Sequence, residues 1–282
     1  MKLPKPTKAI LPVAGYGTRR LPVAKAVDKC MLPLLNRPII DYVVQDVVAA
    51  GVTDVYFVVS DDATQLRDYY SRDIELEQYL QAKGKEQYIP LITPPKNVNF
   101  HFVEQDLSDR RYGSAVPLWL AGRYINSDES FYYVAGDDTL WSADGSSEAA
   151  KLWEQVASTN SDGGLIGCQV PLEDVSKYGV FRLDDQGRYI ELVEKPQPQD
   201  APSTLCNVSK YLFSGIILEY VERYMQQPRD AEYFITDVVN DFVQSRNSMV
   251  VRASDAVYLD CGSLEKWVAA NSYLLEHISA AG

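Results

Sequence analysis

Two glycines and a group of basic residues lie close together near the start of the chain. The run Gly15-Tyr16-Gly17 follows a short apolar segment, and four cations come within the next twelve positions: Arg19, Arg20, Lys25 and Lys29. Glycines let backbone N–H groups approach a polyphosphate, because no Cβ stands in the way. Guanidinium and ammonium groups bind phosphate oxygens. The combination predicts a site for a phosphorylated ligand, whereas a glycine pair alone is equally typical of a tight turn.

This glycine loop differs from two common nucleotide-binding patterns. It lacks a third glycine that opens a helix, since Arg20-Leu21-Pro22 intervenes, and no acidic residue closes a second strand about twenty residues later. A nicotinamide oxidoreductase is therefore excluded. No Gly-Lys-Ser/Thr sequence closes the loop either, so it is not the phosphate loop of P-loop enzymes.

Carboxylates follow two of the predicted strands. Asp137 and Asp138 follow the apolar run 131–135 after the single residue Gly136, and Asp260 follows the run 256–259. Open α/β sheets place their sites at such strand ends, and Mg²⁺ prefers one or two carboxylates together with phosphate oxygens. A polar turn is the alternative for Asp137, and capping of the last helix is the alternative for Asp260.

A third group of polar residues lies in the second half of the chain. Lys177-Tyr178-Gly179 is followed about fifteen residues later by Glu194-Lys195. A carboxylate accepts hydrogen bonds from sugar hydroxyls, and a lysine balances a sugar phosphate. The alternative is a surface ion pair, which contributes little to stability.

Together these residues resemble one family. The N-terminal run resembles the signature of bacterial UTP–glucose-1-phosphate uridylyltransferases (UDP-glucose pyrophosphorylases), through residues 9–19, Leu21-Pro22, Lys25-Ala26, Lys29 and residues 31–33. Residues 177–180, 193–196 and 259–262 resemble later motifs of that family, and the resemblance spans about residues 8–272. The lysine at position 25 resembles a lysine of the uridylyltransferase branch of the family.

The resemblance implies a reaction and a set of site residues. The reaction is transfer of a uridylyl group from UTP to glucose 1-phosphate, with Mg²⁺ as cofactor and pyrophosphate as the other product. The implied catalytic residues are Arg19, Lys29 and Lys195, and the implied metal ligands are Asp137 and Asp260. The implied nucleotide-binding residues are Ala14, Gly15, Gly17, Thr18, Lys25, Gln105 and Gly113, and the sugar-binding residues are Gly179, Glu194 and Lys195.

Four positions depart from the family pattern. Cys30 stands in place of glutamate, Ser114 of histidine, Ser209 of glycine and Phe234 of glutamine. These departures leave two alternatives open. One is a related sugar-1-phosphate nucleotidyltransferase with another base or sugar, for example dTTP with glucose 1-phosphate. The other is a module that binds a nucleotide sugar without turnover.

The elements that would position these residues alternate along the chain. Strand-like runs at 9–14 and 54–59 flank a helical pattern at 38–50, which is the order of a parallel sheet. We predict an α/β fold: a single Rossmann-like nucleotidyltransferase domain over 1–282, with a central mixed, mainly parallel sheet flanked by helices. Its nucleotide-binding part is expected at about 8–140, its sugar-binding part at about 160–262 and a C-terminal helix at about 264–278. Residues 62–95 read as an inserted amphipathic helix plus loop, and 185–187 as a turn.

Composition limits the possible partners. The net charge of −12 argues against nucleic-acid and anionic-membrane partners. No apolar run approaches the roughly 20 residues that cross a bilayer, and the first residues do not resemble a signal peptide. The four cysteines have no metal-finger spacing, so we expect free thiols and a cytoplasmic location. From the resemblance we expect a homo-oligomer, dimer or tetramer, with UTP and a sugar 1-phosphate as substrates.

Overall fold

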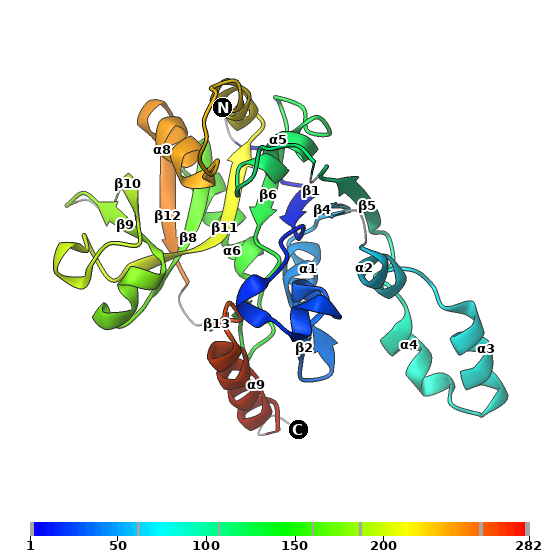
Figure 1. The fold of residues 1–282 in the computed structure, drawn as a ribbon. Helices are drawn as coiled ribbons and strands as arrows, with labels where there is room; N and C mark the ends of the chain where they lie inside the picture. The colour runs from blue at the N-terminus through cyan, green and yellow to red at the C-terminus, as the bar shows by residue number, and fades with distance from the viewer. Residues whose placement is uncertain are drawn as a thin grey trace.

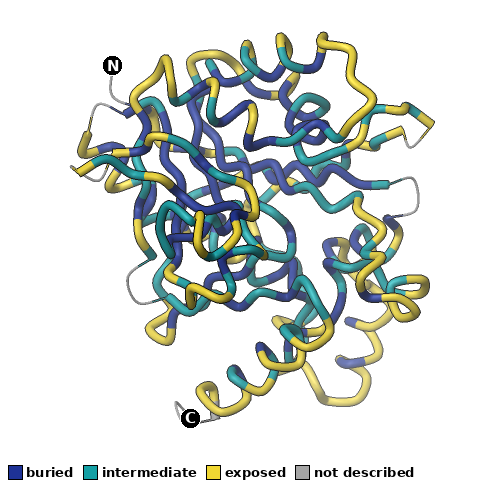
Figure 2. The backbone as a smooth tube through the Cα atoms, turned by 60° about the vertical axis from the view of Figure 1, so that its left-hand side comes forward, coloured by how far each residue is buried: buried dark blue, intermediate teal, exposed yellow. Residues whose placement is uncertain are grey.

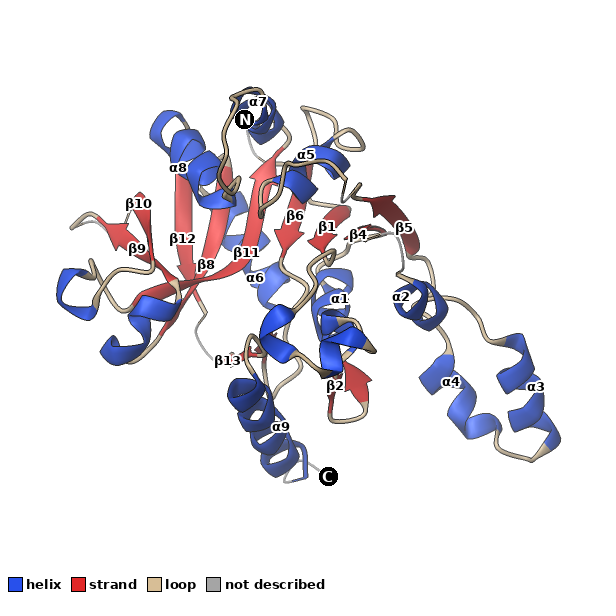
Figure 3. Ribbon diagram, in the orientation of Figure 1, coloured by secondary structure: helices blue, strands red, loops and turns tan. Residues whose placement is uncertain are grey.

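The chain folds around one nine-stranded mixed sheet (Figure 1). The structure is a computed structural model that describes residues 3–60, 63–106, 108–159, 161–185, 188–253 and 256–279. The path through the sheet is β10-β9-β11-β6-β1-β4-β5, and β8 and β12 join it beside β11. Helices flank the sheet, so the predicted fold class is confirmed (Figure 3).

The N-terminal half of the sheet is parallel. β1 pairs in parallel with β4 on one side and with β6 on the other, and β4 pairs with β5. The four strands are β1 (Lys8–Pro12), β4 (Asp54–Val59), β5 (Asn99–Glu104) and β6 (Ser130–Val134). Their carboxyl ends therefore meet at one edge of the sheet, as the strand–helix–strand order predicts.

The second half is mostly antiparallel and is organised around the long strand β11 (Leu205–Ser214). β11 runs antiparallel to β6, β8 and β9, whereas β12 is parallel to β8. The remaining strands are β8 (Gly163–Gln169), β9 (Gly179–Leu183), β10 (Tyr189–Glu194) and β12 (Ser248–Arg252). Gln186 and Gly187 of the turn predicted before β10 lie outside the described residues.

Helices cover both faces of the sheet, and the side chains of each strand alternate between two cores. Val55 and Phe57 of β4 both belong to the core under α1 and α6, whereas Tyr56 belongs to the core under α5, α7 and α8. These buried strands form the dark centre of Figure 2. The helices are α1 (Ile39–Ala49), α5 (Val116–Gly122), α6 (Glu148–Ser158), α7 (Ile217–Met225) and α8 (Ile235–Ser245).

Two small sheets and the last helix lie at the carboxyl end of β1. β7 (Asp138–Trp141) pairs antiparallel with β13 (Val257–Asp260), and β2 (Pro33–Leu34) pairs with β3 (Arg37–Pro38). Helix α9 (Leu264–Ser279) packs on β13 through a third apolar cluster that contains Leu259 and Leu274. Sequence analysis did not predict β7, and this strand brings Asp138 directly opposite Asp260.

The segment from 63 to 95 forms an arm beside the sheet. Three helices replace the single predicted amphipathic helix: α2 (Thr64–Tyr69), α3 (Ile74–Ala82) and α4 (Ile89–Ile92). The prediction of one helix was wrong: α2 ends at Tyr69 before α3 begins at Ile74, and Gly84, with φ 65°, follows the end of α3. Asp62, the first residue of the predicted insertion, lies outside the described residues. In Figure 1, α3 and α4 project away from the sheet.

A buried ion pair ties the sheet to the helices at its back. Lys210 of β11 is 1% exposed and its ammonium contacts the Asp46 carboxylate of α1. The other Asp46 oxygen accepts a hydrogen bond from the Ser147 hydroxyl at 2.7 Å and from the Ala149 N–H at 3.1 Å. Breaking such a pair from one side leaves an uncompensated buried charge.

Replacement of Lys210 by methionine should therefore lower the free energy of unfolding by about 3–5 kcal/mol. Urea denaturation followed by circular dichroism measures this loss. Lys177→Met is the matched control, because its pair with Asp174 is exposed to solvent and should contribute far less to stability than the Lys210 pair. Equal losses in the two variants would contradict this assignment.

Candidate active site

A pocket opens at the carboxyl ends of β1 and β6, where the glycine loop leaves the sheet. Its volume is about 350 Å³. One wall comes from the segment after β1, a second from the segment after β6, and a third from the loop before α5. The lining residues are Pro12, Val13, Ala14, Gly15, Tyr16, Lys29, Cys30, Gln105, Tyr112, Gly113, Ser114, Pro117, Gly136 and Asp137. This is the size of a small-molecule site.

The glycine loop faces this pocket. Gly17 has φ 61°, a left-handed conformation that glycine adopts without strain, and a short 3-10 turn over Thr18–Arg20 follows it. A Cβ built on Gly15 meets no atom within 4 Å, so the space beside Gly15 is open. A ligand can therefore approach the backbone at Gly15 closely.

We expect Gly15→Ala to fold normally and to raise the KM for the nucleotide by about tenfold, a free-energy change of about 1.4 kcal/mol. The added methyl would occupy the open space without meeting the protein. Steady-state kinetics and thermal unfolding separate the two effects. Gly113→Ala is the contrasting variant, because its Cβ would lie 2.4 Å from the Tyr233 carbonyl and should lower the Tm. An unchanged KM in Gly15→Ala would show that the ligand does not pass this position.

Lys29 and Asp137 meet inside the pocket. The Lys29 ammonium contacts the Asp137 carboxylate, and the Arg20 guanidinium stands 3.6 Å from the same oxygen. Arg20 also donates a hydrogen bond of 3.0 Å to the Lys29 carbonyl. Two cations from the N-terminal loop thus converge on one carboxylate at the end of β6.

Arg20 is the buried arginine of this site. It is 4% exposed, and its Nε and one terminal nitrogen have no hydrogen-bond partner among the described residues. Arg19, its neighbour, is exposed. Both arginines were candidates for phosphate binding by residue type, but only the fold of the 3-10 turn decides which of them turns inward.

Asp138 follows Asp137 and begins strand β7. Burial, together with the charges of Asp137 and Asp260, raises the pKa of Asp138 to about 7, although the Tyr258 hydroxyl donates a 2.7 Å hydrogen bond to this carboxyl. Asp138 follows Asp137 in the chain and lies opposite Asp260 in the pairing of β7 with β13, so both carboxylates disfavour its charged form.

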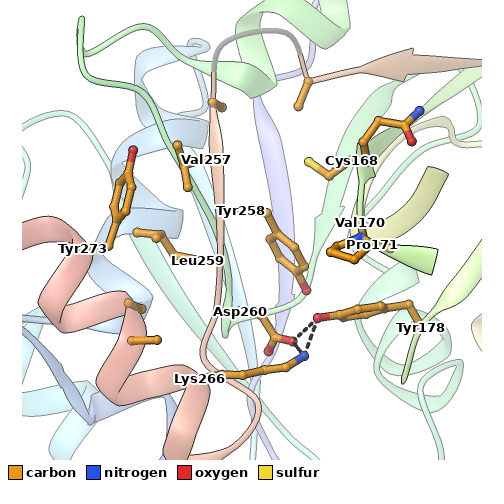
Figure 4. A pocket seen from close by; sticks show the side chains of 15 residues that line it. Cys168, Val170, Pro171, Tyr178, Val257, Tyr258, Leu259, Asp260, Lys266 and Tyr273 are labelled. Atoms are coloured by element: carbon orange, nitrogen blue, oxygen red, sulfur yellow. Dashed lines mark hydrogen bonds and ion pairs between the residues drawn. The ribbon is translucent and has the colours of Figure 1, made fainter. Parts of the chain in front are cut away.

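Asp260 does not cap the last helix. Its Oδ1 accepts a 2.7 Å hydrogen bond from the Gly262 N–H. The residue that caps α9 is Ser263, whose hydroxyl accepts a 3.4 Å hydrogen bond from the Lys266 N–H. Its Oδ2 accepts a 2.7 Å hydrogen bond from the Tyr178 hydroxyl and contacts the Lys266 ammonium (Figure 4). Burial acts to raise the pKa of Asp260, but the bonds from Lys266 and Tyr178 outweigh it and the pKa is lowered.

A second cavity begins at Asp260. Its volume is about 660 Å³, and it lies between the end of β8, strand β13 and helix α9. Figure 4 shows Tyr178, Asp260 and Lys266 grouped at one end of it, with Val257, Leu259 and Tyr273 along the side of β13 and α9. Each cavity is therefore lined by one of the two carboxylates assigned to the metal: Asp137 lines the first cavity and Asp260 lines the second.

The donor set suits a hard divalent cation. Asp137 and Asp260 provide two carboxylates on either side of Asp138, which follows Asp137 and lies opposite Asp260. Mg²⁺ takes one or two carboxylates and fills its other positions with water or phosphate oxygens. Among the described residues, no group of three or more histidine, cysteine, aspartate or glutamate side chains has the geometry of a complete metal site. Two carboxylates together with phosphate oxygens of a substrate would complete a Mg²⁺ site.

The loop before α5 is held by the start of α8. The Tyr233 N–H donates to the Tyr112 carbonyl at 2.9 Å, and the Ala115 N–H donates to the Tyr233 carbonyl at 2.9 Å. The Ser114 hydroxyl accepts a 3.0 Å hydrogen bond from the Ile235 N–H. Serine at position 114 therefore has a structural partner here. Leu107 in the same loop lies outside the described residues.

The residues expected on the sugar side lie at the ends of β9 and β10. Lys195 is exposed, has φ 47°, and its ammonium stands 3.6 Å from Glu194 Oε1. A Cβ on Gly179 would lie 3.1 Å from Glu194 Oε2. The Lys195 N–H donates to the Tyr178 carbonyl at 2.9 Å. Lys195 is thereby linked through Tyr178 to Asp260.

The structure brings together about half of the predicted nucleotide and metal residues. The pocket at the ends of β1 and β6 is lined by Ala14, Gly15, Lys29, Gln105, Gly113 and Asp137, whereas Gly17, Thr18, Arg19 and Lys25 are not among its lining residues. Sequence reasoning missed Tyr112, Tyr178 and Lys266 as site residues. Two of these residues had a signal in the sequence: Tyr178 lies in the motif at 177–180, and Lys266 follows Asp260 within the first turn of a predicted helix.

The other departures from the family pattern have local explanations. Cys30 lines the pocket, and burial followed by the charges of Asp28 and Asp137 raises the pKa of its thiol to about 12. Ser209 has φ 48°, a left-handed conformation that glycine adopts without strain. Phe234 is the residue before α8, and its N–H donates to the Tyr224 hydroxyl at 3.2 Å.

Two further predictions concern the whole chain. All four cysteines are free and buried, as expected. A search of the described residues finds no helix with the length and apolar character that a membrane span requires.

Comparison with known proteins agrees with this geometry. A sequence profile of the nucleotidyl transferase family matches residues 8–277. The protein named UTP–glucose-1-phosphate uridylyltransferase 1 of Streptococcus pyogenes serotype M3 is 32% identical, over 97% of this chain and 90% of that protein.

Two solved structures are also similar to this chain. The UTP-bound UGPase from Acinetobacter baumannii has a TM-score of 0.84 and 26% identity, and covers 96% of this chain and 94% of its own. A UDP-glucose pyrophosphorylase complexed with UDP-glucose has a TM-score of 0.79 and 27% identity, over 96% and 99% of the two chains. The resemblance found in the sequence motifs is confirmed.

Proposed function

The chain belongs to the nucleotidyl transferase family, and we propose that it transfers the uridylyl group of UTP to glucose 1-phosphate, giving UDP-glucose and pyrophosphate. The observation that carries the proposal is the convergence of Lys29 and Arg20 on Asp137, at the boundary of the nucleotide pocket. The names of the similar proteins, UTP–glucose-1-phosphate uridylyltransferase and UDP-glucose pyrophosphorylase, support the choice of base and sugar.

The proposed chemistry needs no covalent intermediate on the protein. A phosphate oxygen of the sugar 1-phosphate attacks the α-phosphorus of UTP in line, the bond to the β-phosphate oxygen breaks, and pyrophosphate leaves. The attacking oxygen is already anionic, so the protein supplies positioning and charge neutralisation. Lys29 and Arg19 stabilise the leaving pyrophosphate, while Lys195 balances the incoming sugar phosphate.

Asp137 and Asp260 are the residues that would hold Mg²⁺. When bound, the ion neutralises charge on the phosphate oxygens. Arg20 keeps the Asp137 side chain in place through its guanidinium and keeps the Lys29 backbone in place through its 3.0 Å hydrogen bond. Tyr178 fixes the Asp260 carboxylate through its hydroxyl. These contacts orient both carboxylates before any substrate arrives.

The two substrates would enter from different sides of the carboxylates. Ala14, Gly15 and Gly17, with Thr18 and Lys25 beside them, would receive the nucleotide, while Gln105 and Gly113 read the base from the loop before α5. Gly179, Glu194 and Lys195 would receive the sugar. The fourteen residues assigned from sequence, together with Arg20, would thus form a nucleotide side and a sugar side, with Asp137 and Asp260 between them.

Pyrophosphate release tests the proposal. The purified chain would be mixed with Mg²⁺, one of UTP, dTTP, ATP, GTP or CTP, and the 1-phosphate of glucose, galactose or N-acetylglucosamine. We expect the highest kcat/KM with UTP and glucose 1-phosphate, and loss of turnover with EDTA. A preference for dTTP would support the related thymidylyl transfer instead, and binding of UDP-glucose with no turnover of any pair would support a binding module.

The proposal includes a setting for the enzyme. We propose a cytoplasmic enzyme, in which the four buried thiols remain reduced. We also propose a homo-oligomer, dimer or tetramer. Light scattering coupled to size-exclusion chromatography measures the oligomeric state.

A further inference from the structure

Lys266 contacts Asp260 and Tyr178 from helix α9, which the sequence analysis did not connect with the site. It lies in the first turn of α9, and its ammonium contacts both Asp260 Oδ2 and the Tyr178 hydroxyl (Figure 4). The ammonium also lies 4.4 Å from the centroid of the Tyr178 ring. The exposed fractions of the Lys266 and Asp260 side chains are 29% and 15%, so this pair is only partly screened by solvent.

The donors on Asp260 differ in how firmly they are held. The Gly262 N–H is part of the backbone, and the Tyr178 hydroxyl stands on a rigid ring that adjoins β9. Lys266 has a flexible four-carbon stem. A divalent cation on Asp260 would repel the ammonium beside it. Lys266 is therefore the donor that leaves when a cation binds Asp260.

The released ammonium would still border the cavity that Lys266 lines. Lys266 lines the 660 Å³ cavity whose nearby walls are mostly apolar, including Val170, Pro171 and Ala269. An ammonium facing such walls needs an anionic partner. Lys195, the lysine assigned to the sugar phosphate from sequence, is 62% exposed and pairs with Glu194, so it stands farther toward solvent than Lys266.

We propose that Lys266 is a transferable cation, which neutralises Asp260 in the free enzyme, yields it to the divalent cation, and then binds the phosphate of the incoming sugar 1-phosphate. This inference rests on the proposed function for its last step. Charge is conserved at each stage: the ammonium exchanges one anionic partner for another, and the divalent cation takes over the carboxylate. No covalent bond changes.

The first test measures metal binding without any substrate. Mn²⁺ binding to the purified chain, followed by the loss of the free-ion electron paramagnetic resonance signal, should be about fivefold tighter in Lys266→Met than in the unmodified chain, since the competing ammonium is gone. Lys8→Met is the matched control, because Lys8 pairs with Glu129 at the amino ends of β1 and β6, away from the carboxyl ends where Asp137 lies. It should bind Mn²⁺ like the unmodified chain. Unchanged or weaker Mn²⁺ binding in Lys266→Met would overturn the proposal, because a purely structural lysine would give that result.

The second test separates the two substrates. In Lys266→Met the KM for glucose 1-phosphate should rise by about tenfold while the KM for UTP stays within about twofold, since one charge-assisted contact to the sugar phosphate is lost. Lys266→Arg should recover part of this loss because it keeps the charge. An equal rise in both KM values would overturn the phosphate role. If the unmodified chain makes no UDP-glucose while Mn²⁺ binding still tightens in Lys266→Met, the proposed function fails and the competition for Asp260 stands.

Discussion

Lys29→Ala should lower kcat/KM for UTP by about a hundredfold to a thousandfold, as expected for loss of one group that stabilises developing charge. Lys29 lines the nucleotide pocket and touches Asp137, so its ammonium stands where the triphosphate would meet the carboxylates. Because the lost contact is made most strongly when pyrophosphate leaves, kcat should fall as well as kcat/KM. Pyrophosphate release under steady-state conditions measures both constants.

Two further variants make this result interpretable. Lys29→Arg keeps the charge but changes its geometry, and should retain more activity than Lys29→Ala. Lys8→Ala removes an ion-paired lysine from the opposite edge of the sheet and should leave kcat/KM within about threefold, a change of the size expected for a partly exposed pair. A loss in Lys29→Ala no larger than in Lys8→Ala would contradict a catalytic role for Lys29.

Asp137→Asn should lower kcat by about a hundredfold or more, because the amide is neutral and binds a divalent cation poorly. The change also leaves Lys29 and Arg20 without the carboxylate that both of them face. Two unpaired cations in one pocket repel each other. The concentration of Mg²⁺ that gives half-maximal rate should therefore rise together with the loss of kcat.

A titration of the rate with Mg²⁺ measures both effects. Asp144→Asn is the control, since Asp144 lies in an exposed turn and accepts a hydrogen bond from the Ser146 N–H. It should behave like the unmodified chain. If Asp137→Asn keeps a normal Mg²⁺ requirement and loses less than about tenfold in rate, Asp137 does not hold the cation.

The sequence was sufficient for the parallel half of the fold because its signals are local. Each buried strand there is a short apolar run, and Gly15 and Gly51 mark where β1 and α1 end. The pocket around Lys29 and Asp137 follows from this order, since carboxyl ends of parallel strands meet at one edge. A motif that is long and specific then identified the family.

The sequence was insufficient where the direction of a side chain, or the pairing of segments far apart in the chain, determines which residues reach the site. Arg19 and Arg20 have the same chemistry, and the 3-10 turn after Gly17 decides that Arg20 is buried. Strand β7 forms because it pairs with β13, which lies far along the chain: Trp141 pairs with Val257 and Asp138 with Asp260. Lys266 joins the site only because α9 packs on β13.

The most direct test of the central claim is a crystal structure of the chain with UTP and Mn²⁺, in which the anomalous signal locates the cation. We predict one Mn²⁺ bound by both Asp137 and Asp260 together with a phosphate oxygen, the triphosphate beside Gly15 and Lys29, and the Lys266 ammonium moved off Asp260. Nucleotide bound outside the pocket of Gly15 and Asp137, or Mn²⁺ away from both carboxylates, would contradict it.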